Sequence, residues 1–146
     1  MKTKVALAFT LALALSACAS VPMASLEGDN QAKSFKAAPG KAAIYLYRNE
    51  SFGGAVRMPV AVNGKLAGQT GPKTYFLWEV EPGAYELSSI GEDTSTLKLN
   101  AIAGKLYFIW QEMKMGLFAP RSSLQEVDET TGRSGVMEST RAASSF

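Results

Sequence analysis

The stretch PVAVNGKLAG, residues 59–68, decides the fold class of this chain. Its central Asn63-Gly64 pair stands between two short apolar runs. An Asn-Gly pair flanked in this way is the strongest short-range signal for a β-hairpin, because both residues accept the positive φ angles of a two-residue turn. The sequence therefore predicts an antiparallel hairpin here.

Short β-type runs continue on both sides of this hairpin, separated by turn residues about every ten positions. Besides the two hairpin strands, the runs span residues 42–47, 74–80, 84–89, 94–101 and 106–110. About seven short strands without a long helical period predict an all-β fold. We expect an antiparallel β-sandwich, Ig-like or transthyretin-like, over residues 40–127, in preference to a partly open barrel.

Composition limits both size and chemistry. A chain of 146 residues with 47% hydrophobic and 19% charged residues fits one globular domain and excludes a disordered or multi-spanning protein. The absence of histidine removes the commonest general base and the imidazole metal ligand. The single cysteine, Cys18, excludes an intrachain disulfide and any multi-cysteine metal site. We therefore expect a protein that is not an enzyme, with no catalytic residue, cofactor or metal.

The first residues predict export. Lys2 and Lys4 precede a mostly apolar run, Val5 to Leu15, which matches the charged and apolar regions of a secretory signal. The run is too short for a transmembrane helix, which needs about 20 apolar residues. Residues 1–17 are therefore predicted to be a signal peptide that is removed.

The end of this leader resembles the lipobox of bacterial lipoproteins. Leu15-Ser16-Ala17-Cys18 places small residues before the only cysteine in the chain. The resemblance implies cleavage before Cys18 and acylation of that residue, with palmitate among the chains that hold it in the membrane. Ala19, in place of an aspartate, implies sorting to the outer membrane, facing the periplasm or, alternatively, the cell surface. A chance cysteine after an ordinary signal peptide is the other interpretation.

Residues 18–39 are rich in Ala, Ser, Gly and charge and show no sustained periodicity, so we expect a flexible tether. Fully extended, about 20 residues reach roughly 70 Å, which would hold the domain clear of the membrane. An ordered first strand through Phe35 is the alternative. Since the leader contains two of the 15 basic residues and none of the 13 acidic ones, the mature chain is neutral, and no nucleic-acid partner is expected.

Two predicted strands are apolar on both faces, whereas the outer face of a sandwich is usually polar. They are residues 75–78 and 106–110. The C-terminal part of the chain is the expected cover, with a candidate short helix from Asp128 and a disordered tail within residues 128–146. Its apolar residues are Met113, Met115, Leu117, Phe118, Leu124 and Val127. If it does not cover the strands, they form an exposed surface for a partner or ligand.

Three residues are candidates for such a binding surface: Arg48, Trp78 and Trp110. Arg48 ends an apolar strand and could join Phe52 and Arg57 in a loop cluster, although a strand-end arginine often only snorkels to solvent. The pairs Ser95 with Lys98 and Glu79 with Glu81 are weak catalytic candidates. Strand geometry puts Ser95 and Lys98 on opposite faces, and acids beside a turn are normally solvated.

The order of these segments resembles a group of small bacterial envelope lipoproteins catalogued only as a domain of unknown function. The similarity covers about residues 40–130, and it rests on four segments: residues 44–48, the Asn63-Gly64 hairpin, residues 80–87 and residues 103–108. The resemblance implies a lipid-anchored β-domain with no site residues to carry over. We expect an envelope interaction or structural module, with an envelope protein or peptidoglycan as partner. The alternative is a periplasmic carrier of a small ligand or glycan.

Overall fold

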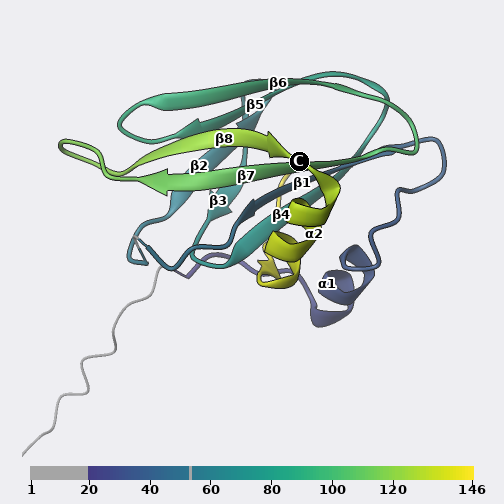
Figure 1. The fold of residues 1–146 in the computed structure, drawn as a ribbon, viewed down its shortest axis with the longest axis horizontal. Helices are drawn as coiled ribbons and strands as arrows, with labels where there is room; N and C mark the ends of the chain where they lie inside the picture. The colour runs from purple at the N-terminus through teal and green to yellow at the C-terminus, as the bar shows by residue number, and fades with distance from the viewer. Residues whose placement is uncertain (1–19, 53) are drawn as a thin grey trace, which may run out of the picture.

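The computed structural model describes residues 20–52 and 54–146, which form two face-to-face β-sheets and two helices (Figure 1). The elements are α1 Leu26–Ala32, β1 Ala42–Arg48, β2 Met58–Val62, β3 Lys65–Thr70, β4 Thr74–Val80, β5 Gly83–Ile90, β6 Thr94–Ala101, β7 Leu106–Lys114, β8 Arg121–Val127, α2 Glu129–Met137 and β9 Thr140–Arg141. One sheet has five strands in the order β8-β7-β1-β4-β9, and the other has four in the order β3-β2-β5-β6. The predicted all-β sandwich is confirmed.

The Asn63-Gly64 hairpin is present as predicted. Asn63 has a φ of 50° and Gly64 a φ of 78°, and the flanking residues Val62 and Lys65 pair across β2 and β3. Positive φ at both turn positions matches the right-handed twist of the two strands. The local sequence alone therefore fixes this connection.

The five-stranded sheet is mixed rather than fully antiparallel. β1 pairs in parallel with β7, and β4 pairs in parallel with β9. The chain enters β7 from β6, which lies in the other sheet, so no tight turn joins β7 to β1 and no turn imposes an antiparallel direction. The strand β8, which the sequence patterns did not identify, returns antiparallel along β7.

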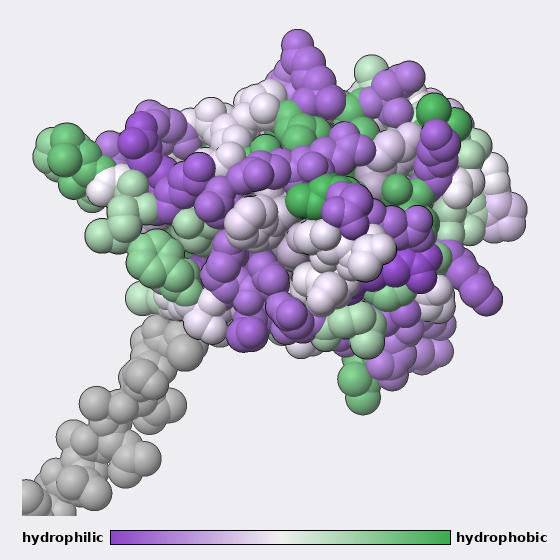
Figure 2. Space-filling view, viewed as in Figure 1, coloured by the Kyte–Doolittle hydropathy of each residue, from purple (hydrophilic) through white to green (hydrophobic). Residues whose placement is uncertain are grey.

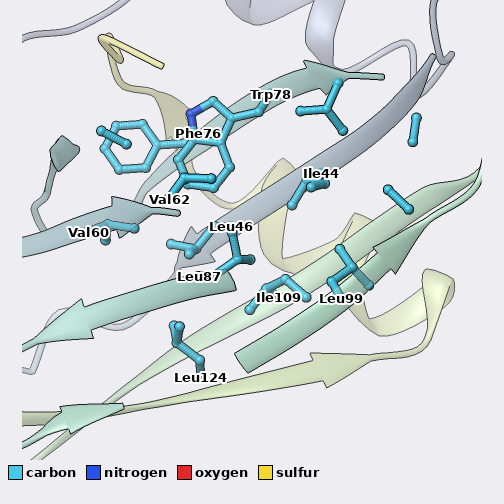
Figure 3. Close-up of a cluster of buried hydrophobic side chains, with 14 of the residues drawn as sticks. Ile44, Leu46, Val60, Val62, Phe76, Trp78, Leu87, Leu99, Ile109 and Leu124 are labelled. Atoms are coloured by element: carbon cyan, nitrogen blue, oxygen red, sulfur yellow. The ribbon is translucent and has the colours of Figure 1, made fainter. Parts of the chain in front are cut away.

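The main core fills the space between the sheets (Figure 3). Its largest members come from alternate positions of strands in both sheets: Ile44, Leu46, Val60, Phe76, Trp78, Leu87 and Ile109. All are at most 2% exposed. The two-residue periodicity of the strands sends one set of side chains into this layer and the other set to the outer faces.

A second core lies on the outer face of the five-stranded sheet, under the two helices. Tyr45, Tyr75 and Phe108 are at most 1% exposed there, and the rings of Tyr45 and Phe108 stack at 5.1 Å. Ala32 of α1 and Val136 of α2 close the cluster. The expectation that the C-terminal part of the chain covers the two-faced strands is correct for α2, and Val127 also packs against this cluster. The cover also includes α1, which was not expected, and it does not include Met115, Leu117 and Phe118, which are exposed.

The prediction of a flexible tether at residues 18–39 is wrong for the part that the structure describes, because α1 packs on the sheet. The buried carboxylate of Asp29 accepts hydrogen bonds from the Tyr75 hydroxyl at 2.7 Å, the Lys33 ammonium at 3.0 Å and the Arg141 N–H at 3.0 Å. The Tyr45 hydroxyl donates to the Ala32 carbonyl at 2.7 Å. These contacts could not be predicted from a polar segment without periodicity, because most of their partners are far away in the chain.

The C-terminal segment also departs from the prediction. The expected helix begins after Asp128, whose side chain accepts a hydrogen bond from the Thr131 N–H, but the tail is ordered. Ala142 is buried, and the Ser145 N–H donates to the Ala67 carbonyl at 2.9 Å. The tail is ordered because β9 adds to the edge of β4.

Within residues 20–52 and 54–146, no helix is both long enough and apolar enough to cross a bilayer. The predicted signal peptide, residues 1–17, and Cys18 lie outside the described residues.

Replacing Asp29 with alanine is expected to lower the free energy of unfolding by about 1–3 kcal/mol, because the buried Tyr75 hydroxyl and two half-buried donors lose this acceptor. Burial, the largest influence, acts to raise the pKa of Asp29, but the hydrogen bonds from Tyr75, Lys33 and Arg141 lower it below its ordinary value of 3.8. Since the folded-state pKa is the lower one, the stabilisation is complete above pH 3.8 and is lost as the pH falls through the folded-state pKa. Urea unfolding of both proteins at several pH values checks this, with Glu27→Gln as an exposed control on the same helix. An Asp29→Ala chain as stable as the wild type would contradict the docking of α1.

Replacing Gly135 with alanine is expected to destabilise the protein, although alanine favours helix by about 1 kcal/mol. A Cβ atom there would overlap Cε2 of Tyr47, so α2 or the ring must move, and overpacking of this kind typically costs about 1–3 kcal/mol. Ser134→Ala, exposed on the same helix, is the matched control and is expected to be neutral or slightly stabilising. Thermal unfolding followed by circular dichroism measures both, and equal midpoints would show that α2 does not pack this closely.

Candidate functional site

Four connections meet at one end of the sandwich, called here the loop end: residues 49–57, of which the structure describes all but residue 53, and residues 71–73, 91–93 and 115–120. β1 and β7 both end there because they run in parallel. The β7–β8 hairpin projects farthest, at the left of Figure 1. Buried polar side chains and exposed apolar side chains both occur at this end. Neither is expected from the alternation of apolar and polar residues in a β-sandwich.

Arg48 lies under the loop end and is fully buried. Its Nη1 donates to the Val56 carbonyl at 2.8 Å and to the Thr70 carbonyl at 3.5 Å, and Nη2 donates to the Phe52 carbonyl at 3.3 Å. Burial lowers the pKa of Arg48, but a guanidinium remains charged in proteins. The prediction that Arg48 belongs to a binding surface is wrong: it holds the 49–57 loop against the core, while Arg57 is exposed.

Next to Arg48, a polar network crosses the core from one sheet to the other. Gln111 of β7 accepts a hydrogen bond from Thr70 at 2.5 Å and donates to Ser89 at 2.6 Å. Ser89 in turn bonds Ser122 of β8 at 2.5 Å. All four residues are buried. The sequence analysis did not predict this network. A glutamine at the inward position between Ile109 and Met113 is the one feature of the sequence that could have indicated a buried polar group here.

The tip of the β7–β8 hairpin is apolar and exposed: Met115 and Leu117 are 79% exposed and Phe118 is 90% exposed. This tip is the green knob at the left of Figure 2. The expectation that these residues cover the aromatic strands is wrong, because β7 runs on to Lys114 and turns back beyond the end of the sheet.

The conformation of the tip is fixed from the neighbouring β5–β6 turn. One carboxylate oxygen of Glu92 accepts hydrogen bonds from the N–H groups of Phe118 and Ala119, both at 3.0 Å. These bonds lower the pKa of Glu92, and an ion pair between Asp93 and Arg121 joins the same two turns. The tip, Val56 and Phe52 line a cleft of about 350 Å³.

The two tryptophans differ in exposure. Trp78 is 2% exposed, its indole N–H donates to the Ser144 hydroxyl at 2.8 Å, and the Phe146 ring meets it edge-on. The prediction that Trp78 forms a binding surface is therefore wrong, because the ordered tail covers it. Trp110 is half-buried and lines a groove between β7 and α2 with Tyr47. Its indole nitrogen is shielded and has no hydrogen-bond partner among the described residues.

The weak catalytic pairs are not assembled. Ser95 points inward and accepts a hydrogen bond from the Leu124 N–H, whereas Lys98 points outward and lies 3.9 Å from Glu86. Glu79 and Glu81 are both exposed, and Glu81 lies 3.6 Å from the Lys41 ammonium. In the part of the chain that the structure describes, no group of three or more Asp, Glu, Cys or His side chains is placed to hold a metal ion.

A family model described as "Protein of unknown function (DUF2846)" matches residues 38–123, which include β1 through most of the β7–β8 hairpin. The chain belongs to this family. It is also 35% identical over 136 residues to an uncharacterized protein of Haemophilus influenzae, an alignment that covers 92% of this chain and 81% of the relative. The predicted resemblance to a domain of unknown function is thus confirmed, and the lipoprotein character stays a prediction.

Replacing Gln111 with leucine is expected to lower the free energy of unfolding by about 1–3 kcal/mol, because the buried Thr70 and Ser89 hydroxyls lose their shared partner. Gln31→Leu, at an exposed position of α1, is the control and is expected to change it by less than about 0.5 kcal/mol. Urea titrations compare the two variants. A stable Gln111→Leu protein would mean that the network does not help to hold the sheets together.

Proposed function

We propose that the protein is an outer-membrane lipoprotein, anchored through acylated Cys18 and facing the periplasm, whose sandwich is a non-enzymatic interaction or structural module. One observation carries the proposal: the lipobox-like Leu15-Ser16-Ala17-Cys18 ends only three positions before Val21, the first buried residue that the structure describes. An acylated cysteine there would join the bilayer directly to the folded domain.

The fold supports a module without turnover. The buried polar groups of the loop end, Arg48 and Gln111 among them, are used to bind backbone carbonyls and neighbouring side chains. Buried polar networks of this kind hold and specify a fold when their members are satisfied. The partner in this proposal, an envelope protein or peptidoglycan, would bind the solvent-exposed surface of the sandwich.

The anchor is tested by expressing the wild type and Cys18→Ala in bacteria supplied with labelled palmitate, followed by fractionation and mass spectrometry of the amino terminus. The wild type is expected to carry label, to start at an acylated Cys18 and to sediment with membranes. Cys18→Ala is expected to lose all label, because the chain has no other cysteine. A bare thiol or a retained leader in the wild type would contradict the anchor.

The interaction role is tested separately by mild crosslinking in cells. The wild type is expected to yield one reproducible envelope protein or peptidoglycan fragments. Recovery of abundant lipoproteins alone, in proportion to their amounts, would contradict a specific module.

A second candidate function, binding of a small ligand or glycan, is favoured by Trp110. Its shielded indole N–H lacks a partner among the described residues and lies beside a groove of about 450 Å³. An unpaired buried donor is a cost that a ligand oxygen would remove, and an aromatic ring beside it gives a sugar an apolar face to stack on.

Indole N–H resonances give an internally controlled test of this second function. Added peptidoglycan fragments are expected to shift the Trp110 signal and to leave the Trp78 signal in place, since the Trp78 N–H already binds Ser144. Equal shifts of both signals, or none at saturating fragment, would remove the Trp110 groove as a binding site.

A further inference from the structure

The apolar tip of the β7–β8 hairpin is the surface feature that neither the fold nor the proposed interaction module explains. Three large side chains, Met115, Leu117 and Phe118, are each at least 79% exposed, and Phe52 of the 49–57 loop is 51% exposed across the cleft. Single exposed apolar residues are common, but a group of them at one projecting tip usually marks a contact surface.

The first described residues of the chain lie at the same end of the molecule as this tip. Pro22 and Arg57 line one groove, and Val56 and Phe52 line the cleft below the hairpin, so the 49–57 loop connects the two places. In Figure 1 the described chain starts at the lower left, beside that loop, and the hairpin extends to the left above it.

The chain is fixed from this point onward. The Ala143 N–H donates to the Pro22 carbonyl at 2.9 Å, and the Ala24 N–H donates to the Arg141 carbonyl at 3.0 Å. Cys18 is three positions before the buried Val21, so even an extended chain separates them by only about 10 Å. A lipid on Cys18 therefore brings the loop end to the membrane surface.

We propose that the tip of the β7–β8 hairpin inserts into the interfacial region of the bilayer in which Cys18 is anchored, so that the domain makes two membrane contacts. The inference rests on the proposed lipid anchor. Apolar side chains at a membrane surface gain by leaving water. Lys114 at the base of the tip is exposed, and its ammonium, 3.4 Å from the Glu112 carboxylate, can turn to a lipid phosphate.

Part of the hairpin backbone is already hydrogen-bonded within the protein. Backbone N–H groups must be satisfied internally where water is scarce, and Glu92 already accepts the N–H groups of Phe118 and Ala119. The tip therefore presents its side chains with two of its backbone donors paired. A bilayer is favoured over a soluble partner because a short anchor at the same end leaves the membrane as the nearest surface.

The test uses the lipidated full-length protein with Leu117→Cys, labelled with an environment-sensitive fluorophore. Because acylation occupies the only native cysteine, Cys18, the new thiol is the single labelling site. Lys105→Cys, exposed in the β6–β7 turn at the opposite end of the sandwich, is the matched control. Both are reconstituted in vesicles of phosphatidylethanolamine and phosphatidylglycerol, with and without nitroxide-bearing lipids.

We expect the emission of the label at position 117 to shift to shorter wavelength and to be quenched by nitroxide lipids, while the label at position 105 shows neither effect. If the protein floats with the vesicles but the two labels behave alike, the anchor stands and the insertion of the hairpin is overturned. A wavelength shift without quenching places the tip against protein, such as a second copy, and also overturns it. Failure to float contradicts the lipid anchor and removes the inference with it.

Discussion

Burial of both faces of the central strands is the constraint on which the rest of this structure depends. All seven residues of β1 are buried, with one set of side chains between the sheets and the other, including Tyr45, under the helices. An apolar outer face must be covered to be stable in water. Two helices supply that cover: α1, which precedes β1, and α2, which lies between β8 and β9.

This cover determines where the domain begins. Because Asp29 holds α1 on Tyr75 and Arg141, residues that precede the first strand pack on the sandwich, and Val21 is already buried. The two chain ends also pair with each other, through an isolated bridge between Met23 and Ala142. Under the proposed anchor at Cys18, the domain lies at the membrane without a spacer and is oriented with its loop end toward the lipid.

The sequence was sufficient for features set by local periodicity and turn chemistry. The strands Thr74–Val80 and Thr94–Ala101 occur with the predicted bounds, as does the Asn63-Gly64 turn. It was insufficient where a residue is used by a distant partner. Asp29 looks like one acid in a polar stretch, and Gly132 and Gly135 look like weak points of a helix. In the structure these glycines let α2 approach Phe108 and Tyr47.

The candidate site shows the same limit. The sequence indicates that Arg48 is a cation at the end of a strand, but its burial depends on how the 49–57 loop closes over it, which no local pattern encodes. The exposure of Met115, Leu117 and Phe118 likewise follows from the length of β7, which continues to Lys114 instead of ending at Trp110. Apolar residues in a connection suggest a segment that covers the core, and only the position of the strand ends shows whether they can reach it.

Neutron reflectometry of the lipidated protein on a supported bilayer tests most directly that the folded domain starts at the anchor. The account predicts protein density that begins at the lipid headgroups, with no solvent layer between them. A hydrated gap of several tens of ångströms, approaching the roughly 70 Å reach of an extended 20-residue tether, would contradict it.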